Sequence, residues 1–310
     1  MSGTAGRLTV ADLQGSAGRR RKEAAIRRAL FGAAGLAIVI NVLIVVSLVD
    51  GTIDFLSTVD LASLWTEGWF PRRGLFDVRT VLVGTLLVSA VAMLVAAPLG
   101  LGAAMYLSEY ATPRARRLLK PILEVLAGIP SVVMGFFALT WISPNIVQRL
   151  FDGATAFNMA AAGIGVGILI TPLVASVAED AMFAVPGDLR EASYGLGARK
   201  RHTTLRIVSP AAVSGIVAAL ILGLSRAIGE TLVVTIAAGG TGGSLLSVNV
   251  TEAGQTMTAA MTALATGSDQ VKGASDAFPS LFFLGALLFF ITLSLNVVSE
   301  RFVRRIRRRY

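Results

Sequence analysis

Two residues of opposite charge stand four positions apart inside a long apolar segment. Arg226 and Glu230 belong to the sequence SRAIGET at 225–231, within the apolar run 211–238. On a helix this spacing places both side chains on one face, where they can pair. The planar guanidinium of arginine stays charged at any pH and matches the oxygens of a carboxylate or a phosphate. Arg226, Glu230 and the adjacent Thr231 are therefore candidate residues of a pathway for an oxyanion.

The depth of this pair limits its interpretation. At about 1.5 Å per residue, Arg226 lies roughly 24 Å along a helix that begins near Pro210, close to the middle of the segment. A charge in the middle of a bilayer costs at least about 2.5–3.5 kcal/mol on insertion scales, so something must offset it. Two interpretations remain open. The pair is either a structural link to a neighbouring helix or the lining of a polar path for a charged solute.

Small residues and a proline indicate how the surrounding helices pack. A stripe of small residues at every fourth position lets another helix approach closely, and it places Arg226 beside that interface. The members of this stripe are Gly215, Ala219, Gly223 and Ala227. Pro130 removes one backbone hydrogen bond and clashes with the preceding turn, so it predicts a helix break. A break at membrane depth requires surrounding protein or a cavity.

The composition of the whole chain is that of a membrane protein. Of 310 residues, 54% are hydrophobic and 15% are charged, whereas a soluble chain uses about 25% charged residues. A bilayer crossing takes about 20 predominantly apolar residues. The chain contains six such segments, which predicts an all-α membrane protein with six transmembrane helices. The predicted spans are residues 29–49, 81–107, 119–142, 156–178, 211–238 and 279–299.

The distribution of basic residues predicts the orientation of the spans. Segments on one side of the membrane hold 22 of the 28 Lys and Arg residues, and segments on the other side hold five. Both termini are therefore expected in the cytoplasm. We predict a cytoplasmic tail at 1–28, a transmembrane domain at 29–300 and a basic cytoplasmic tail at 301–310, with the tails near anionic lipid. The domain includes a cytoplasmic loop at 179–209 and an external loop at 239–278.

The same counts narrow the classes of function. Membrane topology accounts for the net charge of +9, so no nucleic-acid partner is expected. The chain has no cysteine and a single histidine, His202, which excludes thiolate chemistry and a multi-histidine metal site. No span offers a His/Asp/Glu cluster or a nucleophile–base pair, so we expect neither a metal site nor catalytic residues.

The cytoplasmic loop carries a spaced pattern with a known counterpart. EAS at 191–193 is followed by Gly197 and then by IVSP at 207–210. The pattern resembles the Glu-Ala-Ala, Gly, Ile-x-Leu-Pro signature of permeases in ATP-binding cassette (ABC) importers, with Ser193 in place of Ala and Ser209 in place of Leu. The resemblance implies a type I ABC importer permease fold, in which this loop docks to a cytoplasmic ATPase. By this resemblance the residues at the ATPase contact are Glu191, Ala192 and Gly197.

Two further motifs are similar to those of permeases in phosphate-specific (Pst) importers. They are LAGIPSVVMG at 126–135, with Met134 where such permeases usually carry Tyr, and RAIGET at 226–231. AIGETLVVT at 227–235 resembles the PstC-type subunit more than the PstA-type. The similarity covers about residues 75–300.

This resemblance implies a transport subunit and not an enzyme. A PstC-type permease would share a phosphate pathway with a second, PstA-like permease in the bacterial inner membrane. An external PstS-like phosphate-binding protein would deliver phosphate, and a PstB-like ATPase dimer would bind ATP and magnesium. The chain itself is then expected to bind no cofactor. Transport would follow from rocking of the subunits around a site at the midplane.

Other transporters remain open at this point. An ABC permease for another oxyanion, such as phosphonate, molybdate or sulfate, would have the same composition. An ion-coupled secondary anion carrier would need no ATPase, so the loop around Glu191 would be dispensable in it.

Overall fold

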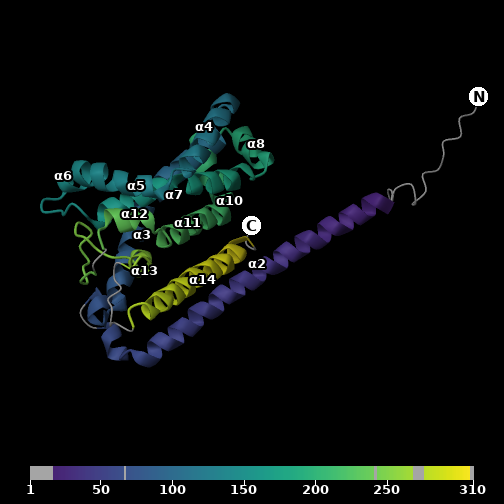
Figure 1. The fold of residues 1–310 in the computed structure, drawn as a ribbon. Helices are drawn as coiled ribbons and strands as arrows, with labels where there is room; N and C mark the ends of the chain where they lie inside the picture. The colour runs from purple at the N-terminus through teal and green to yellow at the C-terminus, as the bar shows by residue number, and fades with distance from the viewer. Residues whose placement is uncertain (1–16, 66–67, 241–242, 268–275, 308–310) are drawn as a thin grey trace, which may run out of the picture. The chain divides into compact units, whose positions relative to one another are not determined.

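The computed structural model is predominantly helical (Figure 1). Its described residues are 17–65, 68–240, 243–267 and 276–307. The chain divides into two compact units, Met1–Asp50 and Gly51–Tyr310. Within the described residues, five helices are long and apolar enough to cross a membrane, and six crossings result if one bent pair counts as a single span. The predicted multi-span helical architecture is confirmed.

The first unit consists of most of one long helix. α2 (Ala17–Thr58) contains the first candidate span, Arg21–Thr58, and continues into the second unit at Gly51. Residues 17–28 of the predicted N-terminal tail are part of this helix, whereas residues 1–16 lie outside the described residues. The division into two tails and a transmembrane domain stays a prediction.

The second unit is a bundle of helices arranged around α3 and α7. Its longer helices are α3 (Val78–Met105), α4 (Pro113–Ala127), α7 (Met159–Phe183), α11 (Val213–Ile228) and α14 (Pro279–Arg307). Its shorter helices are α5 (Ser131–Phe137), α6 (Gln148–Leu150), α8 (Gly187–Gly195), α9 (Lys200–Thr203), α10 (Ser209–Ala211), α12 (Leu232–Ala237) and α13 (Met257–Ala265). The π-helical segments are η3 (Tyr106–Tyr110), η4 (Ala138–Val147) and η5 (Thr204–Val208). The 3-10 turn η1 (Leu61–Trp65) precedes an antiparallel hairpin of β1 (Trp69–Phe70) and β2 (Leu75–Phe76), and the 3-10 turn η2 (Pro71–Arg73) connects its two strands.

Glycines in α7 bring this helix into close contact with the backbone of α3. A Cβ added at Gly163 would lie 2.6 Å from the Cβ of Val91, and one at Gly167 would lie 2.7 Å from the carbonyl oxygen of Ala92. Helices in membranes associate mainly by such close packing, because lipid offers no hydrophobic driving force between them. The α3–α7 pair is therefore a rigid centre for the unit.

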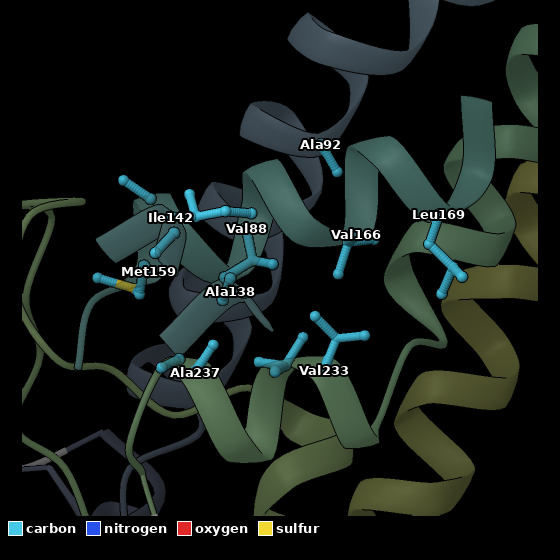
Figure 2. Packing of buried hydrophobic residues seen from close by; sticks show 14 of the residues in the cluster. Val88, Ala92, Ala138, Ile142, Met159, Val166, Leu169, Val233 and Ala237 are labelled. Carbon is cyan, nitrogen blue, oxygen red and sulfur yellow. The ribbon is translucent and has the colours of Figure 1, made fainter. Parts of the chain in front are cut away.

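The largest apolar cluster lies where α3, η4, α7 and α12 meet (Figure 2). Figure 2 shows Val166 of α7, Ala138 of η4 and Val233 of α12 directed into a common interior. Gly165 permits this approach, since a Cβ there would lie 2.9 Å from the Cβ of Ala138 and 3.3 Å from a methyl of Val233. The short helix α12 is thereby fixed against α7.

The predicted third span has the wrong boundaries. The candidate span is Ser131–Leu150, whereas residues 119–127 belong to α4, which ends before Pro130. All fifteen residues of α4 are described, and each is half-buried or exposed. α4 is amphipathic, and its apolar residues extended the apolar run of the sequence beyond the start of the candidate span.

The predicted fifth span is not a single helix. α11 ends at Ile228 and α12 begins at Leu232. The N–H of Glu230 donates to the carbonyl oxygen of Ala227 at 3.2 Å, a bond over three residues that tightens and ends the last turn. The segment Lys200–Ala211 is bent by 73° against α11. Hydropathy alone did not reveal the break between α11 and α12, because Ile228 and Leu232 on its two sides are apolar.

The segment between α12 and α14, predicted as an external loop at 239–278, contains a buried helix. Met257, Ala260 and Leu264 of α13 pack in an apolar cluster with Trp69 of the hairpin. Trp69 and Ser244 exchange backbone hydrogen bonds of 2.8 and 3.0 Å. α13 itself contains small residues, of which Ala259, Ala260 and Ala263 are buried.

Candidate functional site

Arg226 lies in the last turn of α11 with its side chain 55% exposed. Its neighbour Ala227 and Gly223, one turn earlier, are buried. The carbonyl groups at a helix C-terminus carry a partial negative charge, which favours a cation there. The break after Ile228 thus stabilises the charge of Arg226, and a continuous helix would not do so.

Glu230 faces Arg226 from the other side of the break. A guanidinium nitrogen (Nη2) of Arg226 lies 3.5 Å from the Oε2 of Glu230, and the Glu230 side chain is 3% exposed. Charge-assisted hydrogen bonds between such groups are about 2.7–2.9 Å long. The buried Oε2 has no hydrogen-bond partner among the described residues. The pair is therefore held by charge and not by directed hydrogen bonds.

Thr231 completes the set predicted for the pathway. It is half-buried, and its hydroxyl donates to the carbonyl oxygen of Gly229 at 3.3 Å. Its own carbonyl oxygen accepts from the hydroxyl of Thr235 at 2.7 Å. The structure thus brings Arg226, Glu230 and Thr231 together at one interruption of the helix.

The break at Pro130 lies beside this interruption. Pro130 has an extended ψ of 132° and directly precedes α5, which packs against α12 (Figure 1). A Cβ at Gly135 of α5 would lie 3.0 Å from the Cα of Val233 and 3.1 Å from the carbonyl oxygen of Leu232. The helices that follow the two breaks, α5 and α12, therefore pack directly against each other.

The stripe of small residues on α11 faces α7. A Cβ at Gly215 would lie 2.3 Å from the Cβ of Ala181, and one at Gly223 would lie 2.7 Å from a methyl of Val174. The two alanines of the stripe are also shielded, with Ala219 fully buried. A larger side chain at either glycine would push α11, and with it Arg226, away from α7.

The loop helix α8 carries the residues predicted to contact an ATPase. Glu191 and Ala192 are exposed, and Leu196, directly after the helix, is 90% exposed. Ser193 faces inward, where its Oγ lies 2.9 Å from the Oγ1 of Thr203 in α9. The serine that replaces alanine in the signature thus makes a hydrogen bond to α9 that alanine could not make.

Gly197 ends α8 in a defined turn. Its φ is +78°, its N–H donates to the carbonyl oxygen of Tyr194 at 2.9 Å, and the N–H of Ala198 donates to that of Ser193 at 3.1 Å. These two bonds form a Schellman motif, which requires a left-handed residue at this position. Glycine adopts that conformation without a steric penalty.

Ser209, the other departure from the signature, stabilises the approach to α11. Its N–H and its Oγ both donate to the carbonyl oxygen of Thr204, with 2.9 Å for the Oγ. Thr204 belongs to η5, so both bonds secure the wide turn that leads through α10 into the bend before α11.

Arg190 joins α8 to two other elements. One of its terminal nitrogens (Nη2) lies 2.8 Å from the Oε1 of Glu109, a buried residue of η3, and its Nε lies 3.2 Å from the same oxygen. Its terminal nitrogens also donate to the carbonyl oxygens of Val185 (2.6 Å) and Met182 (2.8 Å). Sequence reasoning missed this clamp, because its charged partners lie 81 positions apart and no local pattern connects them.

A second charged group fixes α4 to the end of α7. The Nζ of Lys120 lies 2.8 Å from both the Oε2 of Glu179 and the Oδ1 of Asp180. Arg116 also pairs with Glu179 and stacks over the ring of Phe183 at 3.9 Å. The hydrogen bonds to Asp180 and Glu179 raise the pKa of Lys120 above its ordinary value. α4 is therefore fixed by its basic face.

Comparison with known proteins assigns the family of the chain. Residues 96–310 match the model of the family described as binding-protein-dependent transport system inner membrane component. The chain belongs to this family. As a multi-span helical permease of this kind, it lies in the bacterial inner membrane, as predicted.

Relatives of this permease include phosphate transport proteins. It is 31% identical to the phosphate transport system permease protein PstC of Mesorhizobium japonicum, over 93% of this chain and 95% of that one. It is 39% identical to the phosphate transport system permease protein PstA 1 of Mycobacterium tuberculosis (H37Rv), over 56% of each chain.

Solved structures establish the fold of the permease. A bacterial alginate ABC transporter in complex with a periplasmic protein superposes with a TM-score of 0.59 at 17% identity, over 92% of this chain and 97% of that one. The inward-facing MetNI methionine ABC transporter gives 0.50 at 19% identity, over 77% and 96%. The predicted ABC importer permease fold is therefore confirmed.

Proposed function

We propose that this permease is the PstC-type subunit of an ATP-driven phosphate importer. PstC proteins are similar to it over most of its length, whereas the similarity to PstA 1 covers 56% of it. The observation that carries the mechanism is the exposed guanidinium of Arg226 at a helix break. It lies 3.5 Å from a buried carboxylate that it does not hydrogen-bond.

Arg226 would bind phosphate directly during passage. A guanidinium offers parallel N–H donors that match two phosphate oxygens. Between transport events Glu230 neutralises Arg226, and an arriving phosphate replaces the carboxylate. Little is lost in this exchange, because the pair lacks directed hydrogen bonds. The return of Glu230 then helps release the anion, and Thr231 adds a hydroxyl beside it.

A PstA-like second permease would close the pathway on the open side of Arg226. The same face of α11 carries Leu222, which is 45% exposed. An arginine facing lipid at this depth would be costly, and a second subunit removes that cost by enclosing it. The anion then passes between two subunits, as in transporters that alternate around a midplane site.

A PstB-like ATPase dimer would dock on the exposed surface of Glu191, Ala192 and Leu196. ATP and magnesium bind to that dimer, and this permease supplies neither a cofactor site nor catalytic residues. The excess of basic residues at both termini and around α8 supports a cytoplasmic location for them. The segment at 239–278 then faces a PstS-like phosphate-binding protein outside, and anionic lipid contacts the basic tails.

Uptake of radiolabelled phosphate into proteoliposomes tests this function. The vesicles would contain the permease with its partner permease and ATPase, and the binding protein would be added outside. We expect uptake that requires ATP and the binding protein and that excess phosphate abolishes. Competition by phosphonate, molybdate or sulfate at equal concentration would reassign the substrate. Uptake that persists without ATP and follows an ion gradient would instead identify a secondary carrier.

A further inference from the structure

The segment at 239–278 reaches the helix break through the first turn of α13. Thr258, in that turn, is 5% exposed, and its hydroxyl donates to the carbonyl oxygen of Glu230 at 2.7 Å. The hydroxyl of Thr256, which caps α13, lies 3.1 Å from that of Thr258. It also accepts from the N–H of Ala259 at 3.2 Å.

Each hydroxyl carries one proton, and this fixes the direction of the chain of hydrogen bonds. The carbonyl oxygen of Glu230 can only accept, so Thr258 uses its proton there. Thr256 must then donate to Thr258, and its lone pairs remain for the N–H of Ala259. Such bonds in sequence polarise and strengthen one another inside a protein. The result is a single directed relay from the cap of α13 to the backbone of the residue that faces Arg226.

The start of α13 is also fixed on its other side. The N–H of Met257 donates to the hydroxyl of Thr85 in α3 at 3.0 Å. Just before the helix, Gln255 is packed so closely that a Cβ at Gly84 would lie 2.3 Å from its carbonyl oxygen. Gln255 is 1% exposed, and neither polar atom of its amide has a partner among the described residues. The first turn of α13 is therefore joined both to α3 and to the backbone of Glu230.

We propose that Thr258 is a positioning residue that couples the segment at 239–278 to the Arg226–Glu230 pair. The proposal rests on the proposed function, in which a binding protein contacts this segment from outside. The Glu230 carboxylate is held by charge alone, so its position depends on its backbone, and Thr258 holds that backbone. A movement of α13 on docking then shifts Glu230 relative to Arg226 and opens the arginine to the arriving anion.

Thr258→Val tests the relay, because valine keeps the shape of threonine and removes the hydroxyl. In the assembled transporter we expect phosphate uptake and binding-protein-stimulated ATP hydrolysis to fall about tenfold, in the range of a lost buried hydrogen bond. ATP hydrolysis without the binding protein should stay at the wild-type rate. Thr258→Ser restores a hydroxyl at the same place, so it should restore at least half of the stimulation.

Thr262→Val is the matched control, one turn further along α13. The Thr262 hydroxyl donates at 2.9 Å to the carbonyl oxygen of Thr258 within its own helix and does not reach Glu230. Stimulation close to wild type in this variant supports the relay. An equal loss in Thr262→Val, wild-type stimulation in Thr258→Val, or an equal fall of the unstimulated rate would each overturn it. A wild-type transporter stimulated by its binding protein but unable to move phosphate would refute the proposed substrate and leave the relay testable.

Discussion

Two of the arginine–glutamate pairs among the described residues of the permease are held in different ways. Arg190 binds Glu109 through contacts of 2.8 and 3.2 Å and also donates to two carbonyl oxygens. Arg226 lies 3.5 Å from Glu230, whose Oε2 has no hydrogen-bond partner among the described residues. The Arg190 side chain is 19% exposed and the Arg226 side chain 55%.

The Arg190–Glu109 pair is therefore a fixed contact, and the Arg226–Glu230 pair is a contact that another anion can replace. Removing one member of a satisfied buried pair leaves an isolated charge, so such a pair resists separation. A pair held only by charge exposes its arginine to any competing anion of suitable shape. In the proposed importer, the same two residue types would therefore fasten α8 in one place and offer a binding group in the other.

The largest expected effect is on transport by Arg226→Ala. Phosphate uptake should fall by about 100-fold or more, equivalent to about 3 kcal/mol, because the pathway loses its cation. In the Arg226→Ala, Glu230→Gln double variant no buried carboxylate is left without its cation, so the thermal unfolding of that purified transporter should change little. Arg149→Ala, which removes an exposed arginine of α6, should leave uptake unchanged. Normal uptake by Arg226→Ala would show that the Arg226–Glu230 pair is structural, like the Arg190–Glu109 pair.

Arg190→Ala should act mainly on stability. Burying Glu109 without its partner costs about 3–5 kcal/mol, so thermal unfolding of the transporter should begin at a clearly lower temperature. Replacing both residues with glutamine should recover part of this loss, because no isolated charge remains. The matched control is Arg201→Ala on α9, where the arginine is exposed. Unaltered stability in Arg190→Ala would mean that the clamp does not hold α8.

Gly195 and Gly197, at the end of α8, should respond differently to substitution by alanine. Gly197→Ala should destabilise the transporter by about 1–2 kcal/mol, since alanine is strained at positive φ. Gly195 lies in α8 with open space around it, so Gly195→Ala should be neutral or stabilising by up to about 1 kcal/mol. Thermal unfolding of the two variants side by side measures the difference. Equal effects would contradict the Schellman turn.

The smallest effect is expected at Ser193. Ser193→Ala restores the residue of the family signature but removes the hydrogen bond to Thr203, at a cost of about 1 kcal/mol. Adding Thr203→Val should return most of that loss, because Ser193→Ala leaves the buried Thr203 hydroxyl only a long contact of 3.5 Å to the carbonyl oxygen of Arg199. A double-mutant cycle of unfolding free energies gives this coupling, and purely additive effects would show that the two hydroxyls do not interact.

Much of the fold was predictable because hydropathy reports the environment of each segment directly. The apolar runs predicted the membrane spans, and the spacing of Glu191 and Gly197 within the family signature predicted the permease fold. The roles assigned to these residues remain predictions. The run at 211–238 failed as a single helix, because hydropathy does not register a backbone break between apolar residues.

Long-range contacts account for the rest of what the sequence did not predict. Arg190 was only one of the basic charges that orient the chain, and nothing near it in sequence indicates Glu109. α13 lies among glycines, serines and threonines, which indicate a loop unless their neighbours in space are known. Thr258 belongs to this class, since its partner Glu230 is 28 positions away.

The segment Lys200–Ala211 and α11 meet at a bend of 73°. A bend of this kind can convert a displacement of one segment into a movement of the other in a different direction. In the proposed importer, closure of the docked ATPase would displace α8 and α9. A corner that keeps its angle converts this displacement into rotation of α11, whose far end carries Arg226. The lengths of the two segments and the angle between them then set how far Arg226 moves in each ATP-driven cycle. Changing the stiffness of the bend at Ala212 would alter that distance without changing a contact to the nucleotide or to the anion.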